Sequence, residues 1–335
     1  MNYQPKNILV TGGAGFIGSH FVRYMLNTYA DIHIYNLDLL TYAGHLENLQ
    51  EAQEDPRHTF LHGNITDRAT VTQWFEQYRF DTIVHFAAES HVDRSIADPK
   101  IFIETNIVGT WILLDLARQF WLNQWHWGED DCRFHHISTD EVYGALGRLD
   151  PAFSETTPYH PNSPYSASKA SADHFVHAYH HTYGLPITLT HCSNNYGPFQ
   201  DLEKFIPTVI NSCLNQKPIP LYGDGSHIRD WLYVEDHCMG IDCVIRAGRV
   251  GENYHMGGNS ELSNRTVLEI ITTQFDALFP EHAPHARLIL TVADRAGHDW
   301  RYAMNSEKIQ KELEWQPLIS FKEGLAKTIA AMFIT

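Results

Sequence analysis

The chain has 335 residues, of which 43% are hydrophobic and 12% aromatic, so it can form one large or two ordinary domains with an apolar core and is not disordered. Its formal net charge of −16 disfavours nucleic acid or an anionic membrane surface as a partner. The absence of an apolar run of about 18 residues, the lack of a leader-like start and five scattered cysteines together predict a reduced, cytoplasmic protein without a membrane span.

The first half of the chain alternates short apolar strands with helical patterns. Strands are predicted at 7–13, 32–38, 59–63, 82–88, 134–139 and 186–193, and helices at about 15–29, 67–79, 99–122 and 163–183. Short apolar strands separated by helices indicate a parallel sheet with helices on both faces. In such sheets, ligands bind beyond the carboxyl ends of the strands.

The pattern changes after about residue 195. The turn sequences YGP, YGDGS and MGGNS separate helical patterns near 201–216, 231–248, 263–278 and 320–333. These segments predict a smaller α/β lobe at the edge of the sheet. We therefore expect an α/β fold in which a Rossmann-type, doubly wound parallel sheet occupies 1–195, with part of 230–260, and a C-terminal substrate-binding lobe occupies 196–335.

The first predicted turn carries the sequence TGGAGFIGSH. Gly12, Gly15 and Gly18 stand three residues apart between a strand and a helix, where glycine permits a tight turn and lets backbone N–H groups approach a pyrophosphate. Asp38 ends the second strand, where a carboxylate can accept hydrogen bonds from both adenosine ribose hydroxyls and would repel a 2′-phosphate. The sequence therefore predicts an NAD site rather than an NADP site. An ordinary turn between a strand and a helix is the alternative.

The segment SPYSASKASADHF predicts a helix with a functional face. Ser163 is a suitable N-cap and Pro164 suits the first helical position. Tyr165 and Lys169 then lie four residues apart on one face. An ammonium group beside a phenol favours the phenolate and lowers the tyrosine pKa, so Tyr165 is expected to act as a general base. For this spacing taken alone, an exposed pair on an amphipathic helix is the alternative.

Two adjacent acids end the fifth predicted strand. The segment HHISTDEVYG places Thr139, Asp140 and Glu141 where the strand meets the ligand-binding edge of the sheet. Carboxyl groups near a core are costly to bury. Charge repulsion and a low dielectric can hold one of the two carboxyls protonated, so that one donates a proton while the other accepts one.

Several of these segments also resemble a known family. TGGAGFIG, FAAESHVDRS, YSASK and SNNYGP are similar to the extended short-chain dehydrogenase/reductase family, and HHISTDEVYG, EKFIP, LYGDGSHIRDWLYVEDH and ADRAGHDWRYAMN resemble its nucleotide-sugar 4,6-dehydratase branch. The resemblance extends from about residue 6 to about residue 325. The segment STDEVYG is the discriminating part, because epimerases of the family keep the tyrosine and lysine but generally lack the Asp–Glu pair.

The resemblance implies a hydro-lyase that acts on a nucleotide sugar, with dTDP-glucose as the expected substrate and a 4-keto-6-deoxy sugar as the product. Tyr165 would take the C4 hydroxyl proton as hydride passes to NAD, and Thr139 would hydrogen-bond the C4 oxygen. Glu141 would remove the C5 proton, and protonated Asp140 would deliver a proton to the departing C6 hydroxyl. The hydride would return to C6, so NAD is expected to stay bound through turnover.

The resemblance also implies a set of residues for each task. The catalytic set is Thr139, Asp140, Glu141, Tyr165 and Lys169. The NAD-binding set is Gly12, Gly13, Gly15, Phe16, Ile17, Gly18, Asp38, Asn64, Ile65, Phe86, Ala87, Ala88, Ser90, Thr105, Tyr165, Lys169 and Asn195. The substrate-binding set is Ser90, Thr139, Asn194, Lys204, Phe205, Pro220, Leu221, Tyr222, Arg229, Asn264, Arg295 and His298. The two arginines suit a diphosphate because their planar forks bind phosphate oxygens, and no metal is expected.

The sequence departs from the family pattern at Leu39, Asn64, His191 and Ala296. None of these is in the catalytic set, so they bear on cofactor affinity and base specificity rather than on the reaction. The alternatives are a UDP-sugar 4,6-dehydratase, a C4-epimerase or a decarboxylase of the same family, and a non-catalytic protein that binds a nucleotide sugar. A homodimer is expected from the resemblance, with the helices near 99–122 and 163–183 as its interface.

Overall fold

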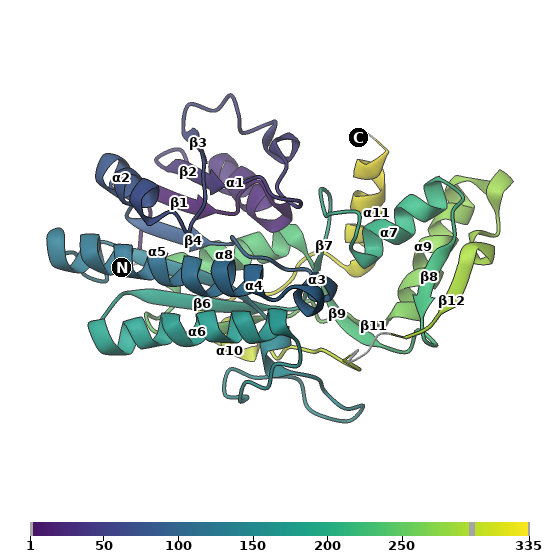
Figure 1. Ribbon diagram of the computed structural model, residues 1–335. Coiled ribbons are helices and arrows are strands. Elements are labelled where there is room, and N and C mark those ends of the chain that lie inside the picture. Colours follow the sequence, from purple (N-terminus) through teal and green to yellow (C-terminus); the bar gives the residue numbers. More distant parts are fainter. Residues whose placement is uncertain (1–2, 295–298, 334–335) are drawn as a thin grey trace.

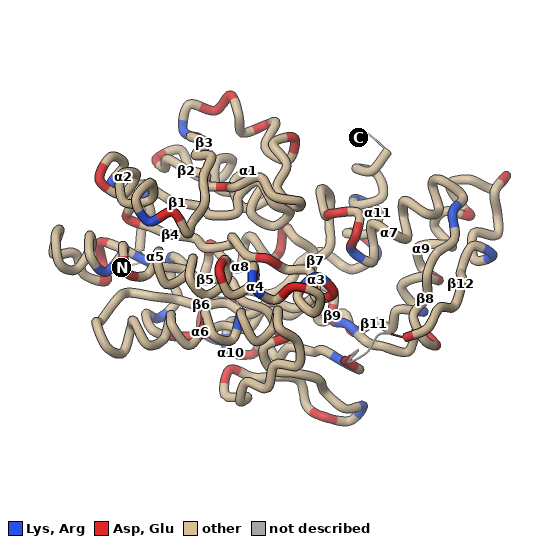
Figure 2. The backbone as a smooth tube through the Cα atoms, viewed as in Figure 1, with Lys and Arg blue, Asp and Glu red and all other residues tan. Residues whose placement is uncertain are grey.

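The computed structural model describes residues 3–294 and 299–333. Figure 1 shows two parts, a large sheet covered by helices and a smaller lobe beside it. The chain has a net charge of −16, and its acidic residues are spread over both parts (Figure 2). None of the helices in the described ranges is long and apolar enough to cross a membrane.

The large sheet has seven parallel strands, and the chain crosses it as the alternating pattern predicts. In chain order the strands are β1 (Asn7–Thr11), β2 (His33–Asp38), β3 (His58–His62), β4 (Thr82–His85), β5 (Arg133–Thr139), β6 (Ile187–Cys192) and β10 (Asn253–Met256). They lie in the order β10-β6-β5-β4-β1-β2-β3. The strand order reverses between β1 and β4, which is where doubly wound sheets bind their ligands. The predicted fold class is confirmed.

Helices cover both faces of this sheet. They are α1 (Phe16–Thr28), α2 (Arg68–Tyr78), α3 (Val92–Ala97), α4 (Lys100–Phe102), α5 (Thr110–Ala117), α6 (Pro164–Tyr183), α8 (Val234–Ala247) and α10 (Glu307–Leu313), with π-helical turns η2 (Ile103–Gly109) and η3 (Arg118–Gln124) on either side of α5. Ile8 and Val10 of β1 pack with α1 and α8 on one face, whereas Leu9 packs with α2, α5 and α6 on the other. This alternation is the pattern of a strand buried on both sides.

The small lobe has its own apolar core and two short sheets. Its strands are β7 (Asn194–Tyr196), β8 (Ile219–Tyr222), β9 (Ile228–Tyr233), β11 (Glu261–Ser263) and β12 (Ile289–Val292), and its helices are α7 (Phe205–Leu214), α9 (Asn264–Leu278) and α11 (Phe321–Met332). The strands form a β11-β9-β7 sheet and a β12-β8 pair. Short 3-10 turns η1 (Leu46–Leu49), η4 (Asp140–Tyr143), η5 (Pro280–His282) and η6 (His285–Leu288) complete the described elements. Three later elements, α8, β10 and α10, pack on the large sheet, not in the lobe.

The helix expected over 231–248 is wrong at its start, because it begins at Val234 and the preceding residues form β9. β9 pairs in parallel with β7 and antiparallel with β11, two partners that are remote in the sequence. The segment WLNQWHWGEDD at 121–131, which carries three tryptophans, extends the helix before it and packs locally. Trp121 is buried, and Trp125 and Trp127 pack against each other beside the Arg79 guanidinium.

Candidate active site

A cavity of about 400 Å³ opens at the carboxyl edge of the large sheet. Its wall is formed by residues that follow β1, β2, β4, β5 and β6, together with residues from the first turns of α1 and α6. Parallel strands end at the same edge, so residues far apart in the sequence meet there.

The glycine turn at one end of this cavity leaves backbone exposed. Gly12 has φ +74°, and a Cβ atom on it would lie 2.6 Å from the backbone nitrogen of Ala87. A Cβ atom on Gly18 would lie 2.3 Å from the carbonyl oxygen of Gly12. Helix α1 starts here with Gly15 as its N-cap, and no side chain caps its first N–H groups. Those groups are therefore available to an anion such as a pyrophosphate.

Asp38 lies at the edge of the same cavity, at the end of β2. Its Oδ2 accepts from the N–H of Ala14 at 2.9 Å, and its Oδ1 accepts from the N–H of Leu40 at 2.8 Å. Burial raises the pKa of this carboxyl, and the two backbone donors oppose the rise. Each oxygen keeps a further acceptor position, so the carboxylate can also bind two ribose hydroxyls. The turn and Asp38 together fit an NAD molecule.

Tyr165 and Lys169 enter the cavity from the first turns of α6. The helix starts as predicted, with a Ser163 capping box and Pro164 at its first position. The Lys169 ammonium donates to the carbonyl oxygen of Ile137 at 2.7 Å. Burial and the Glu141 carboxylate raise the pKa of Tyr165 well above its usual value. The expected lowering of the Tyr165 pKa is therefore wrong, because removal of the phenol from water raises it.

The two acids lie where β5 turns into η4. The Thr139 hydroxyl donates to Asp140 Oδ1 at 3.2 Å and accepts from the N–H of Glu141 at 3.3 Å. Asp140 is buried, and its Oδ2 has no hydrogen-bond partner within residues 3–294 and 299–333. A buried carboxyl oxygen without a partner is costly unless the group is protonated or receives a ligand.

The environments of the two acids differ. Burial, followed by the neighbouring Glu141 charge, raises the pKa of Asp140 well above its usual value. Burial also raises the pKa of Glu141, to about 7, while the positive charges of Arg229 and Lys204 limit the rise. Asp140 can therefore donate a proton at neutral pH, whereas Glu141 can accept one.

The structure brings most of the predicted site residues to this one cavity. Those that line it are Gly12, Gly15, Phe16, Ile17, Gly18, Asp38, Asn64, Ile65, Phe86, Ala87, Ala88, Ser90, Thr105, Thr139, Asp140, Glu141, Tyr165, Lys169, Asn194, Asn195 and Lys204. Gly13 does not line it: a Cβ atom there would lie 2.1 Å from Asn36 Oδ1, so Gly13 lets the turn pack against β2. Arg295 and His298 lie outside the described residues.

Six predicted substrate residues lie apart from the cavity. They are Phe205 at the start of α7, Pro220, Leu221 and Tyr222 in β8, Arg229 in β9 and Asn264 at the start of α9. A second cavity, of about 570 Å³, is lined by their sequence neighbours Asp224, Gly225, Ser226, Ile228, Ser263 and Arg265, with Arg148 and Trp300. None of these lining residues belongs to the predicted catalytic, NAD-binding or substrate-binding sets.

Arg229 connects the acid pair with the small lobe. Its Nη1 donates to the carbonyl of Ile228 at 2.7 Å, its Nη2 donates to the carbonyl of Asp299 at 3.0 Å, and its guanidinium stacks on the Tyr302 ring at 4.4 Å. These contacts use neutral groups, so its positive charge is not paired by them. That charge acts on the Glu141 carboxyl and would also suit a phosphate.

Sequence reasoning missed several residues that line the first cavity. They are Leu37, Leu39, Thr41, Ala43, Gly44, His45, Gly63, Glu89, Ile101, Ile137, Ser138, Cys192, Ser193, Phe199, Gln200 and Asp201. Most of them end or directly follow a strand of the large sheet, so position after a strand was an available signal for them. No group of three or more His, Cys, Asp or Glu side chains suited to a metal ion occurs in the described ranges.

The family model described as GDP-mannose 4,6 dehydratase matches residues 9–328. A dTDP-glucose 4,6-dehydratase of Salmonella typhimurium is 51% identical over 330 residues, which are 96% of this chain and 91% of that protein. A dTDP-glucose 4,6-dehydratase of Neisseria meningitidis is 52% identical over 328 residues, covering 97% of this chain and 92% of its own length.

Solved structures agree with these sequence relatives. A dTDP-glucose 4,6-dehydratase of Streptomyces venezuelae with NAD and TYD bound has a TM-score of 0.88 and 44% identity, with 98% of this chain and 97% of that chain covered. A UDP-glucose 4-epimerase of Thermotoga maritima has a TM-score of 0.85 at 26% identity, with 98% and 99% covered. The fold is thus shared by dehydratases and epimerases, and the site must discriminate between them.

Proposed function

The chain belongs to the GDP-mannose 4,6-dehydratase family, and we propose that it is an NAD-dependent lyase that converts dTDP-glucose to dTDP-4-keto-6-deoxyglucose and water. The observation that carries this proposal is the pair of a buried Asp140 and a half-buried Glu141, which lines the same cavity as Tyr165 and the glycine turn. An epimerase needs the tyrosine and the cofactor, but it has no elimination step for which two acids of different proton affinity are required.

NAD, when bound, supplies the hydride acceptor for C4 of the sugar and later the hydride donor for C6. The glycine turn and the first N–H groups of α1 would hold its pyrophosphate, and Asp38 its adenosine ribose. Because hydride removal and return cancel, the protein needs no external oxidant. Purified protein is therefore expected to carry NAD and to turn over without added cofactor.

In the oxidation step Tyr165 accepts the proton of the C4 hydroxyl as a phenolate, so the phenol must first release its own proton to solvent. The Lys169 ammonium, one helical turn away, favours that release. The Thr139 hydroxyl, which lines the cavity beside Tyr165, hydrogen-bonds the C4 oxygen as that oxygen becomes a carbonyl. The resulting ketone makes the proton on C5 acidic, which is the chemical reason why oxidation comes first.

In the elimination step Glu141 accepts the C5 proton while Asp140 donates a proton to the C6 hydroxyl, which leaves as water. The burial of Asp140 keeps it protonated, and Glu141, with a pKa of about 7, is partly ionised at neutral pH. After the hydride returns to C6, the proton on Glu141 can go back to C5. Each acid therefore has one task, set by its surroundings.

The direct test is to incubate purified protein with dTDP-glucose and, separately, with UDP-glucose, without added NAD. The 4-keto product and water loss from C6 are followed by mass spectrometry. We expect turnover of dTDP-glucose at the higher kcat/KM. A faster reaction with UDP-glucose would assign the enzyme to the UDP-sugar alternative, and C4 inversion without loss of water would make it an epimerase.

Glu141→Gln separates the two chemical steps. This variant keeps the side-chain volume but cannot accept the C5 proton, so elimination should slow by about 10²–10⁴-fold. The C4 hydroxyl can still be oxidised by way of Tyr165, so NADH absorbance should accumulate on the protein in a single turnover. Normal water loss by this variant would show that another group is the base.

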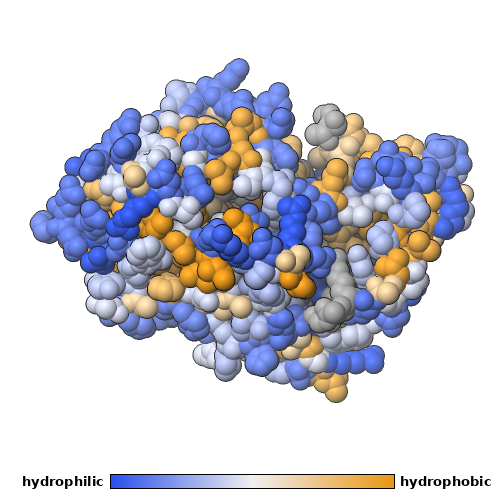
Figure 3. Space-filling view, viewed as in Figure 1, coloured by the Kyte–Doolittle hydropathy of each residue, from blue (hydrophilic) through white to orange (hydrophobic). Residues whose placement is uncertain are grey.

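We propose that the protein is a homodimer that acts in the cytoplasm. The large exposed side chains Ile96, Ile101, Ile103, Val108, Trp111 and Phe175 all lie on α3, α4, η2, α5 and α6. Figure 3 displays an apolar surface over α4 and α5, and α6 packs directly beside them. A contiguous exposed apolar face is typical of an interface. Light scattering should give a dimer for the wild type and a monomer for Trp111→Glu combined with Ile103→Glu.

A further inference from the structure

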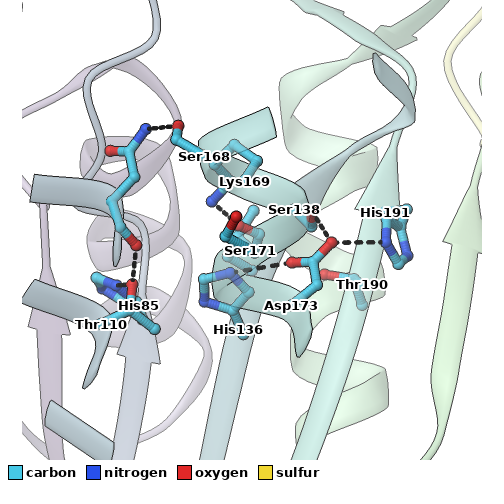
Figure 4. A network of polar contacts seen from close by, with 12 residues as sticks. His85, Thr110, His136, Ser138, Ser168, Lys169, Ser171, Asp173, Thr190 and His191 are labelled. Carbon is cyan, nitrogen blue, oxygen red and sulfur yellow. Dashed lines mark hydrogen bonds and ion pairs between the residues drawn. The ribbon is translucent and has the colours of Figure 1, made fainter. Parts of the chain in front are cut away.

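A cluster of buried polar side chains lies next to the active-site cavity, centred on Asp173 of α6 (Figure 4). The Ser138 hydroxyl donates to Asp173 Oδ2 at 2.7 Å. His191 Nε2 lies 3.2 Å from the same oxygen, and His136 Nε2 lies 3.3 Å from Oδ1. Asp173, His136 and His191 are fully buried and do not line the cavity. None of these three residues has a role in the proposed oxidation or elimination step.

The cluster joins three elements of the site. Asp173 comes from α6, which also carries Tyr165 and Lys169, while Ser138 directly precedes Thr139 at the end of β5. His191 comes from β6, beside β5 in the sheet. Since Tyr165 and the acid pair come from different elements, their relative position depends on contacts of this kind. His191 is one of the departures from the family pattern. It does not line the cavity, and it contacts Asp173 behind the cavity wall.

Asp173 is set up to carry a negative charge. Burial alone would raise the pKa of its carboxyl, but hydrogen bonds from His136 and His191 lower it overall. Burial lowers the pKa of His136 to about 4, so this ring is neutral at physiological pH and acts as a donor rather than as a cation. A fully buried carboxylate is stabilised further by a positive charge close to it.

Lys169 supplies such a positive charge from the same helix. It lies one helical turn before Asp173, so both side chains are on the same face of α6. The lysine side chain is buried, and its hydrogen bond is to the neutral carbonyl of Ile137. Burial lowers the pKa of Lys169, and the negative charge of Asp173 opposes this. A lysine without a counter-charge in such a place loses its proton easily.

The other titratable groups that face Lys169 do not replace Asp173. His85 of β4 and His136 of β5 have lowered pKa values, caused first by burial, and are neutral. Burial raises the pKa of the Cys192 thiol of β6 to about 12, so it is protonated. Tyr165 is protonated before it meets a substrate, because burial raises its pKa too. Within the described residues, Asp173 is the negative charge that these elements direct at Lys169.

We propose that Asp173 is a positioning residue for the C4 oxidation, because its buried carboxylate locks α6 onto β5 and β6 and keeps Lys169 in its ammonium form one turn from Tyr165. The inference rests on the proposed function, since it assigns Asp173 a role in that reaction. It predicts that the charge, and not only the shape, of residue 173 controls the pH range of activity.

The test compares Asp173→Asn with the wild type and with Asp242→Asn. Like Asp173, Asp242 is a buried aspartate on a helix. It accepts from the Tyr29 hydroxyl at 2.5 Å and pairs with Arg246, away from the cavity. For each protein we measure the melting temperature, the NAD content and the rate of NADH formation from dTDP-glucose between pH 6 and pH 10. The wild-type assay comes first, because its failure would refute the proposed function and not the role of Asp173.

Loss of the Asp173 charge should lower the pKa of Lys169 further, so the ammonium form is lost at a lower pH. The alkaline limb of the rate profile should then move down by about one pH unit, with a loss that approaches about 10-fold at pH values above the wild-type limb. Asp242→Asn should lower the melting temperature without moving this limb. A folded Asp173→Asn protein with NAD bound and an unmoved alkaline limb would overturn the proposal.

A second measurement needs no folded variant at position 173. The side-chain resonances of wild-type protein with ¹³C-labelled lysine are followed against pH, and Lys169 is assigned by comparison with Lys169→Met. The Lys169 signal should stay in the ammonium position at pH 7 despite complete burial. A neutral Lys169 at pH 7 would refute the proposal whatever the variants do.

Discussion

The large-sheet part and the small lobe place their functional residues in different ways. In the large sheet, the glycine turn and the acid pair directly follow strands β1 and β5, and Asp38 is the last residue of β2. In the lobe, the corresponding residues lie on short strands and turns whose partners are distant in the chain, as Arg229 does in β9. A parallel sheet therefore assembles its site by architecture, whereas the lobe assembles its part by individual contacts.

The two parts also differ in how strongly they change the chemistry of a side chain. Asp140 and Lys169 of the large-sheet part are buried, and burial is the first cause of the shift in each pKa. Arg229 contributes from the lobe by its charge, which acts across the boundary on Glu141. The reaction should thus depend on the large sheet for its chemistry and on the lobe for affinity and for adjustment of that chemistry.

The largest effect is expected for Gly12→Ala in the large-sheet part. The new Cβ atom would lie 2.6 Å from the backbone of Ala87, at a residue with φ +74°. The clash and the left-handed conformation together should cost about 2–4 kcal/mol of folding free energy and should abolish copurification of NAD. Thermal unfolding and NAD content after denaturation measure the two effects.

Two other glycines separate the causes of this loss. Gly184 has nearly the same backbone angle, φ +73°, with nothing within 4 Å of an added Cβ, so Gly184→Ala should cost about 1–2 kcal/mol and keep NAD. Gly128 has neither a positive φ nor a close neighbour, so Gly128→Ala should change stability by no more than about 0.5 kcal/mol. If Gly184→Ala also lost NAD, the clash at the glycine turn would not be the reason why Gly12→Ala loses it.

An intermediate effect is expected for Arg229→Met, which tests how the lobe acts on the large-sheet part. We propose that Arg229 binds the diphosphate of the substrate, so loss of this charged donor should raise KM by about 10–100-fold. Arg229 also lowers the pKa of Glu141, so its removal should raise that pKa above about 7. Since Glu141 must be ionised to accept a proton, the acid limb of the rate profile should move to higher pH.

The control for Arg229→Met is Arg249→Met, which removes an exposed arginine that pairs with Glu312 away from both cavities. It should leave KM and the acid limb unchanged. A change of KM in Arg229→Met without movement of the acid limb would mean that the lobe provides affinity alone. The chemistry would then depend on the large-sheet part only.

The smallest effect is expected for Lys311→Ala on α10, outside both cavities. Its ammonium pairs with Glu307 at 2.6 Å, one turn apart, but both side chains are mostly exposed to solvent. Surface pairs contribute little because water and salt screen them, so the melting temperature should change by less than about 2 °C and kcat/KM should not change. A larger effect would show that α10 couples to the site through its packing on β10.

The sequence predicts the large-sheet part better than it predicts the small lobe. The six strands of the first half, the start of α6 at Ser163 and the residues that follow strand ends are all visible in the sequence, because apolar runs and caps are local signals. The strands of the lobe are three to six residues long and are stabilised by partners elsewhere in the chain. Their pairing leaves no local pattern, which is why the sequence predicts the last three residues of β9 as the start of a helix.

The site divides in the same manner. Sequence order alone places the glycine turn, Asp38, Tyr165 and the acid pair at one edge, because parallel strands end on the same side. The tertiary structure alone decides that burial outweighs Lys169 in setting the pKa of Tyr165, and that Asp173 meets His136 and His191. Loss of water and the distance between charges depend on which segments fold over a side chain, and those segments are remote in the sequence.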